Sequence, residues 1–366
     1  MKKTIPKIKI TLFLFFLSTV LIAGYGDFSD ELPSRLEREV LVMTNAVRMD
    51  PVGFRDKFIK NAVILLPSNY PAVEPVWYNQ ELSKAARIHS EDMANNCGLS
   101  HNSCDGTTFF KRVTSYYKGS GWLGENIATG NSTGIQTVIQ WLRDDNTQKI
   151  PASDKSSSDG HRQNIMNAQY HEMGAGYSYS KSRQWYHFWT QDFGGGIGFD
   201  YKIPSGCHFS IPGTATEISF AANYYDKSGT APEKASVFID NIEHSMVLFL
   251  GKASSGTYIY STSDDKKPHC YYFLFTSKDH TIRYPQTNTL STSSDSGCLS
   301  ASVKHFTSNQ SQKTIILQTT KTDIYTINGV KQSSISAAAN KKASGILLYT
   351  LPGQNQGIKK LIYLKK

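Results

Sequence analysis

The runs Trp122-Leu123-Gly124-Glu125-Asn126-Ile127 and Gly160-His161-Arg162-Gln163-Asn164-Ile165 decide the fold expected for this chain of 366 residues. An acid and an amide stand together in the first run, and a histidine stands in the second. A further histidine, His101, comes earlier, in Leu99-Ser100-His101-Asn102. Neutral imidazoles and carboxylates are ordinary ligands of zinc, and such a cluster can also transfer protons. The three runs therefore contain the residues of a candidate site.

Helical patterns surround these runs. Four helices are expected, directly after the capping residues Ser34, Asn79, Thr133 and Asp159. The first is the best defined, because Ser34 and Glu37 form a capping box and Asp50-Pro51 ends the apolar pattern. The second reaches Asn95 and carries His89 on its apolar face, where we expect a packed, hydrogen-bonded histidine rather than a metal ligand.

Two strand patterns follow the helices. Met173 to Tyr179 contains Gly174 and Gly176, which would let another backbone come close. Gln184 to Phe193 is rich in aromatic residues and reads as a central strand. Helices and strands mix without a regular strand-helix-strand repeat, so the sequence favours an α+β fold in which helices cover an antiparallel sheet.

The second half of the chain shows strand patterns alone. They run over residues 217–225, 235–240, 257–262 and 271–276, and the spacing predicts a small β-sandwich over residues 205–292. This region resembles the immunoglobulin-like modules of secreted bacterial proteins and is expected to act as a spacer. Residues 310–366 form a short β-rich tail that resembles the C-terminal sorting domains of type IX secretion.

In this order, with Trp141 near the end of the third helix and Thr44 to Arg48 in the first, the runs resemble an SCP domain of the CAP superfamily. That superfamily comprises cysteine-rich secretory, antigen 5 and pathogenesis-related proteins, and the resemblance is to its bacterial secreted type. It covers residues 32–196. It implies an α-β-α sandwich with a wide cleft, at whose floor two histidines and two acids meet.

Carried over by motif, the cleft tetrad is His101, Glu125, Asp144 and His161. The family usually has Glu where Asp144 stands, and Asp145 is the neighbouring alternative. His101 and His161 are then the candidate ligands of a divalent cation such as zinc. The competing interpretation is a polar network that only ties the helices to the sheet.

We expect a non-enzymatic module that binds an extracellular lipid, glycan or protein in this cleft. One alternative is a hydrolase in which His101, Glu125 and His161 carry out metal-assisted or acid/base attack. Another is an adhesin-like protein that acts through the β region. The run His171 to Ala175 lacks the second histidine of a zincin, which argues against that hydrolase class.

Residues 1–26 predict a secretory signal peptide, because lysines precede an apolar run from Ile10 to Ala23. We therefore expect a protein that is secreted or held at the cell surface, with no transmembrane segment after the signal is removed. The net charge is +9, and four of these charges are signal lysines, which leaves five. The sequence has no dense basic stripe with interleaved aromatic residues, so we do not expect nucleic-acid binding.

The chain has five cysteines, and pairs of cysteines in an exported protein favour disulfides. Cys97 and Cys104 flank a short loop and are the expected pair. Cys270 and Cys298 could close a loop in the β region, and Cys207 would then be left over.

Overall fold

The computed structural model describes residues 24–293, with gaps at 30–31, 61–62, 145–153, 155–158, 215 and 279, together with Cys298 and four short strands further on. All but the last three residues of the expected signal peptide lie outside this part. The chain divides into one compact unit up to Phe306 and a second from Thr307 onward. Among the described residues, no helix has the length and apolar character that crossing a membrane requires.

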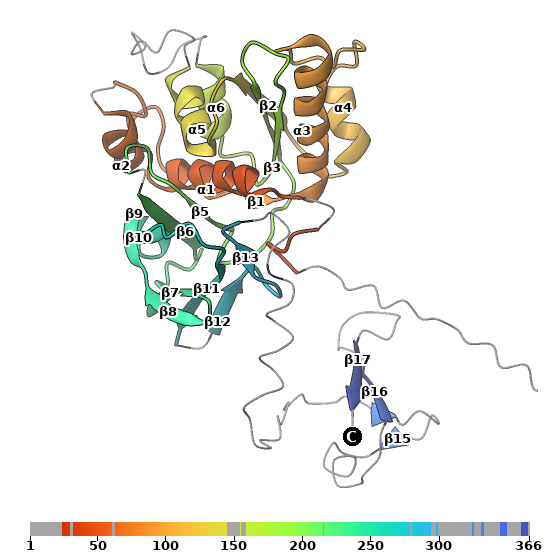
Figure 1. Ribbon diagram of the computed structural model, residues 1–366, viewed down its shortest axis with the longest axis vertical. Helices are drawn as coiled ribbons and strands as arrows, with labels where there is room; N and C mark the ends of the chain where they lie inside the picture. Colours follow the sequence, from red (N-terminus) through yellow and green to blue (C-terminus); the bar gives the residue numbers. More distant parts are fainter. Residues whose placement is uncertain are drawn as a thin grey trace, which may run out of the picture. The chain divides into compact units, whose positions relative to one another are not determined.

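The sheet that carries the candidate site has four strands in the order β1-β3-β4-β2 (Figure 1). Their bounds are β1 Trp77–Tyr78, β2 Leu123–Thr129, β3 Glu172–Tyr179 and β4 His187–Gly194. β1 pairs parallel with β3, and the other pairs are antiparallel. β4 is central, as expected, but it begins later than the pattern predicted, because Tyr186 adopts a left-handed turn conformation.

Helices cover both faces of this sheet, which confirms the α+β class. The helical segments are α1 Arg35–Met49, α2 Pro51–Phe54, η1 Arg55–Ile59, α3 Gln80–Asp92, η2 Met93–Cys97, α4 Phe109–Tyr116, α5 Gly134–Arg143 and α6 Gly160–Ile165. The predicted capping box begins α1, and the side chains of Asn79 and Thr133 cap α3 and α5. Asp159 makes no side-chain cap to α6. Its carboxylate contacts Tyr70 and Arg162 instead.

Glycines in β3 allow α3 to lie close to the sheet. A Cβ on Gly174 would stand 2.0 Å from the backbone nitrogen of Ser83, and one on Gly176 would stand 2.2 Å from the carbonyl carbon of Ala86. Both distances are far below van der Waals contact, so only glycine fits at these two positions. The close backbone approach predicted for this strand is thus confirmed.

α1 is buried between two sheets. One is the sheet described above, and the other has the order β5-β6-β10-β9, with β5 Ser205–Phe209, β6 Glu217–Tyr225, β9 Val247–Lys252 and β10 Ser255–Ser263. Ala221 and Ile259 face the core around α1, while Phe220 and Tyr258 face a third sheet. That sheet has the order β12-β11-β7-β8, with β13 also paired to β11. Its strands are β7 Lys234–Ile239, β8 Ile242–Ser245, β11 Cys270–Ser277, β12 His280–Tyr284 and β13 Leu290–Ser291.

This packing differs from the spacer expected for the β region. Cys207 and Phe209 of β5 belong to the same hydrophobic cluster as Val40 and Val47 of α1. The amide of Asn45 on α1 also donates to the Ser205 hydroxyl at 3.1 Å. The two halves of the first unit therefore share one core, and no gap in packing marks the expected boundary between residues 196 and 205.

The second unit contains a sheet with the order β15-β14-β16-β17. Its strands are β14 Ile324–Tyr325, β15 Lys331–Gln332, β16 Gly345–Tyr349 and β17 Lys360–Leu364. These four strands lie within the β-rich tail expected over residues 310–366. The resemblance to a sorting domain stays a prediction.

Candidate functional site

The candidate site is built around β2, an edge strand of the first sheet. Successive side chains of a strand point to opposite faces. Glu125 lies on the face covered by α3, where it meets residues from α4 and from the loop after η2. Asn126 lies on the other face, where its amide donates to Gln191 at 3.0 Å, and Gln191 in turn donates to Thr44 of α1.

His101 and Glu125 are in direct contact. Nδ1 of His101 lies 2.8 Å from Oε1 of Glu125, and the guanidinium of Arg112 donates to Oε2. Arg112 also donates to the carbonyl of His101 at 3.1 Å, so it holds both partners. The carboxylate is almost fully buried, while the His101 side chain is 56% exposed. Nδ1 of His101 therefore contacts the buried carboxylate of Glu125, while the rest of the ring is open to the surface.

Asp144 and His161 form a second pair. Oδ1 of Asp144 lies 2.6 Å from Nδ1 of His161, whose side chain is about one-third exposed. Asp144 ends α5, and His161 lies in the first turn of α6. Asp145, the alternative for this position, lies outside the described residues.

The two pairs are joined through the backbone of β2. Asn126 donates to the carbonyl of His161 at 3.2 Å, and Asn164 donates to the carbonyl of Glu125 at 3.1 Å. Asn164 also donates to the side-chain oxygen of Asn126 at 2.9 Å. Hydrogen bonds from Asn126 and Asn164 thus hold α6 against β2 at the edge of the sheet. This arrangement explains why an amide stands beside the acid in one motif and after the histidine in the other.

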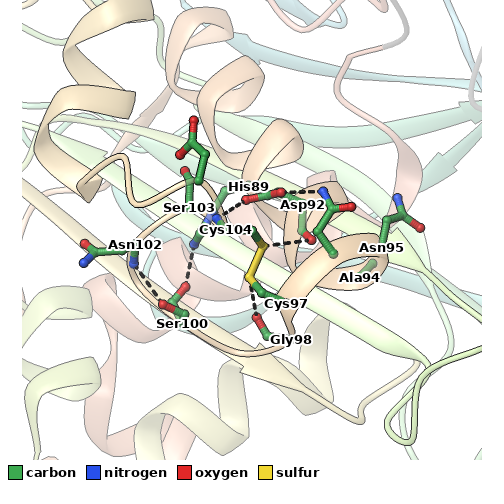
Figure 2. Close-up of a disulfide and its surroundings, with 12 residues drawn as sticks. His89, Asp92, Ala94, Asn95, Cys97, Gly98, Ser100, Asn102, Ser103 and Cys104 are labelled. Carbon is green, nitrogen blue, oxygen red and sulfur yellow. Dashed lines mark hydrogen bonds between the residues drawn. A yellow bond between two sulfur atoms is a disulfide. The ribbon is translucent and has the colours of Figure 1, made fainter.

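The loop that carries His101 is fixed by a disulfide. Figure 2 shows the bond between Cys97 and Cys104, beside Asp92 and His89 of α3. The Cys104 amide donates to the Asp92 carboxylate at 2.7 Å. Nε2 of His89 lies 2.8 Å from the Ser100 carbonyl, and burial lowers the pKa of this histidine, although the charge of Glu125 opposes the shift. His89 is therefore a packed histidine under the loop, in agreement with its position in the sequence.

A second disulfide joins Cys270 to Cys298, and Cys207 is a buried free cysteine. The two expected disulfides are thus present, and Cys207 is the cysteine left over, as expected.

Two residues of the site, Arg112 and Asp192, were not predicted from the sequence. Arg112 lies on α4, a helix that was not expected, and Asp192 is buried on β4 directly opposite Glu125. An alternating strand pattern predicts that Asp192 shares a face with Thr190, but it does not reveal which charged group lies across from it.

Potential metal-ligand atoms come close together at one place in the described part of the chain. Among the described residues, the one group of three or more potential ligand atoms within 4.8 Å of one another is Asp92, Cys97 and Cys104. Both sulfurs are consumed by the disulfide, so this group supplies no thiolate. In the tetrad, each carboxylate contacts the Nδ1 of a histidine. The tetrad is not such a group among the described residues, and its available donors are the Nε2 atoms of two imidazoles, each supported by a carboxylate.

A cavity of about 760 Å³ is lined by residues that neighbour the tetrad in sequence, while no tetrad residue is part of its lining. Leu99, Thr129 and Arg143 line it, and these residues neighbour the His101 loop, the end of β2 and Asp144. Trp185 forms part of the wall and is 56% exposed. Trp185 was expected inside a strand, but it precedes β4 in the β3–β4 connection. The cavity thus shares the His101 loop and the end of α5 with the tetrad.

Comparison with known proteins identifies the domain. The model of the CAP family, described as the cysteine-rich secretory protein family, matches residues 43–193. The protein YkwD of Bacillus subtilis, described as uncharacterized, is 32% identical over 121 residues. The match covers 33% of this chain and 40% of that protein, so it spans less than half of the relative.

Two solved structures are also similar in part. One is an extracellular protein containing a SCP domain from Bacillus anthracis, at 29% identity and a TM-score of 0.26, with 33% of this chain and 34% of that chain covered. The other is an outer surface protein of Borrelia burgdorferi, at 19% identity and a TM-score of 0.27, with 33% and 78% covered. The family match contains both histidines and both acids of the tetrad. Residues 43–193 of this chain are therefore a domain of the CAP family.

Proposed function

We propose that this protein is an extracellular, non-enzymatic binding protein whose CAP domain holds a divalent cation between His101 and His161. One observation carries the proposal. Each of these histidines uses Nδ1 to contact a carboxylate, at 2.8 Å and 2.6 Å, and no described residue occupies its Nε2.

The contacts set the tautomer that a metal needs. A carboxylate that accepts from Nδ1–H leaves the lone pair on Nε2 and makes the ring more basic. Glu125 and Asp144 are then the residues that orient His101 and His161. Zinc is the cation that two imidazoles suit best, with water or a bound ligand at the remaining positions.

The cavity lined by Leu99, Arg143 and Trp185 supports the binding of an extracellular ligand, such as a lipid, glycan or protein. It combines apolar residues such as Leu99 with the exposed ring of Trp185 and the polar side chain of Arg143. Apolar walls with a few polar groups are typical of ligand sites. Among the described residues, no serine, threonine or cysteine side chain is hydrogen-bonded to His101 or His161. The geometry therefore favours binding over nucleophilic catalysis.

An extracellular location agrees with the two disulfides, which form and persist in oxidising compartments. One of the similar solved structures is itself described as extracellular. The segment from about residue 310 is proposed as a sorting address, and its removal is expected to keep the protein in the periplasm. Normal export of the shortened protein would rule that address out.

The metal proposal is tested by calorimetric titration with zinc. We expect wild-type protein to bind zinc at about pH 7.5 and to lose affinity at about pH 5.5, where free histidines are protonated. The His101→Ala/His161→Ala double variant should fold but not bind. His280→Ala removes an exposed histidine of β12 and is the matched control, with binding as in the wild type. Equal and pH-independent binding by wild type and double variant would overturn the metal site and favour a structural network.

A further inference from the structure

Asp192 is a buried acid that the proposed function does not use. It lies on β4 directly opposite Glu125 of β2, and on its other side directly opposite Gly174 of β3. Residues directly opposite each other in an antiparallel pair point to the same face, with Cβ atoms about 4.5–5.5 Å apart. Asp192 is fully buried, and the Glu125 side chain is 2% exposed. Two carboxyl groups therefore face each other under the His101 loop.

No hydrogen-bond donor among the described residues reaches either oxygen of Asp192. Two charged groups act on it, Glu125 from β2 and Arg112 from α4. His89 of α3 lies on the Glu125 side, with Nε2 4.0 Å from Oε2 of Glu125. Arg112 directs its terminal nitrogens to Glu125, the His101 carbonyl and Ser103, while Nε2 of His89 is taken by Ser100. The polar group that interacts with Asp192 is thus the Glu125 carboxylate, which is itself an acceptor.

Two adjacent buried carboxylates cannot both be ionised without a large cost, because neither charge is solvated and like charges repel. Glu125 accepts a hydrogen bond from the guanidinium of Arg112. Asp192 has no such donor. Burial and the negative charge of Glu125 raise the pKa of Asp192 well above its usual value, and Arg112 opposes the shift only in part.

We infer that Asp192 is a neutral carboxylic acid at neutral pH and donates its proton in a hydrogen bond to Glu125. Glu125 then accepts hydrogen bonds from both Asp192 and Arg112. These two bonds fix its carboxylate against Nδ1 of His101. Asp192 is therefore a positioning residue that acts on His101 through Glu125. The protonation state of Asp192 does not depend on the proposed function. Only the effect of Asp192 on metal binding rests on that function.

The proton is tested in the intact wild-type protein by infrared spectroscopy. At pH 7 exposed aspartates are ionised, so the carbonyl band of a protonated acid comes from a buried group. Labelling aspartate with carbon-13 should shift this band, and labelling glutamate should not shift the same component. A spectrum at pH 7 with no protonated aspartate would overturn the inference, whatever zinc does.

Unfolding free energy gives an independent measurement. The unfolded state releases the Asp192 proton above about pH 3.9, while the folded state keeps it. The ratio of folded to unfolded wild type should therefore fall about tenfold per pH unit relative to Asp192→Asn, from about pH 4 up to the raised pKa. Asp226→Asn is the matched control. Burial raises the pKa of Asp226, but bonds from Lys202 and Ser228 outweigh it and lower the value to about 2, so this difference should stay flat above pH 4. A flat difference for Asp192→Asn as well would overturn the inference.

Zinc titration separates the positioning role from the fold. Asp192→Asn keeps an N–H donor for Glu125 and should bind zinc as the wild type does, whereas Asp192→Leu lacks the donor and should bind about tenfold more weakly. Equal binding by both variants would overturn the positioning role. If wild type binds no zinc, the proposed metal function fails, and the infrared measurement still decides where the proton is.

Discussion

Asp144 holds Nδ1 of His161 at 2.6 Å from its Oδ1, and it does so from a left-handed backbone conformation with φ of 52° at the end of α5. Residues other than glycine rarely adopt this conformation, and aspartate and asparagine are among those that do. The position is therefore constrained by both its backbone and its carboxylate. An aspartate at this helix end can reach the ring even though the family usually has glutamate.

Replacing Asp144 should separate these two constraints. We expect Asp144→Ala and Asp144→Gly each to weaken zinc binding by about 10- to 100-fold, because His161 loses the carboxylate that orients it. The glycine variant should be more stable than the alanine variant by about 1 kcal/mol, since glycine tolerates a positive φ. Calorimetric titration and thermal unfolding measure the two effects, and zinc binding at wild-type strength by Asp144→Gly would contradict the role given to the carboxylate.

Arg48 of α1 should be essential for the position of α6. Its fully buried guanidinium donates to the carbonyls of Glu74, Ile165, Asn167 and Tyr170. Arg48→Met leaves these acceptors without their donor, so we expect it to cost more than about 3 kcal/mol in the free energy of unfolding. Lys234→Met removes an exposed cation from the β region and should change little. Similar unfolding curves for the two variants would show that Arg48 does not hold this segment.

The Cys97–Cys104 disulfide should affect the site as well as stability. Replacing both cysteines by serine is expected to cost about 2–3 kcal/mol through the freed loop. Zinc binding should weaken too, because His101 lies inside that loop. The matched control replaces Cys270 and Cys298 by serine, which should lower stability and leave zinc binding unchanged. Titration and chemical unfolding of both variants measure this, and equal zinc affinities in the two would contradict the coupling.

The shared core predicts that the CAP domain and the β region unfold together. Ile259 of β10 packs in the core around α1 and is 6% exposed. Ile259→Ala should cost about 2–4 kcal/mol and lower the midpoint of one common transition. Val247→Ala, at an exposed position of β9, should stay within about 0.5 kcal/mol. Calorimetry that resolves two transitions, with only the later one moved by Ile259→Ala, would show instead that the β region is an independent spacer.

Local signals explain why the helices were predictable. The caps at Ser34, Asn79 and Thr133 use hydrogen bonds within three residues, so the sequence carries them directly. β2 was not recognised as a strand, because glycine, glutamate and asparagine are poor strand formers. Its structure depends on pairing with β4, whose partner residues are 59 to 71 positions away in the sequence. The packing of β5 on α1 is likewise a tertiary fact that no local pattern encodes.

The candidate site shows the same division. Motif order placed His101, Glu125, Asp144 and His161, and the structure pairs each histidine with one acid. Arg112 and Asp192 could not be predicted, since their importance comes from the charge of Glu125 across a helix–sheet interface. A charged residue at an inward position of a strand is the one signal that could have drawn attention to Asp192.

His208 should make the stability of the protein depend on pH. Burial, assisted by the charge of Arg35, lowers its pKa to about 3, and its Nδ1 lies 2.8 Å from the Tyr271 hydroxyl, which also accepts the His208 backbone N–H. The hydroxyl therefore donates to the ring nitrogen, and a proton on that nitrogen would abolish the bond. Between about pH 6.5 and pH 3 the unfolded state binds a proton at this residue and the folded state does not. The contribution of neutral His208 to the free energy of unfolding is full above pH 6.5, and it is lost by about 1.4 kcal/mol per pH unit as the pH falls.

His208→Asn should reduce this dependence of the unfolding free energy on pH, while the exposed control His280→Asn should keep it. Denaturant unfolding at pH 7, 6 and 5 measures the slopes, and identical slopes in wild type and His208→Asn would show that the ring is protonated in the folded protein.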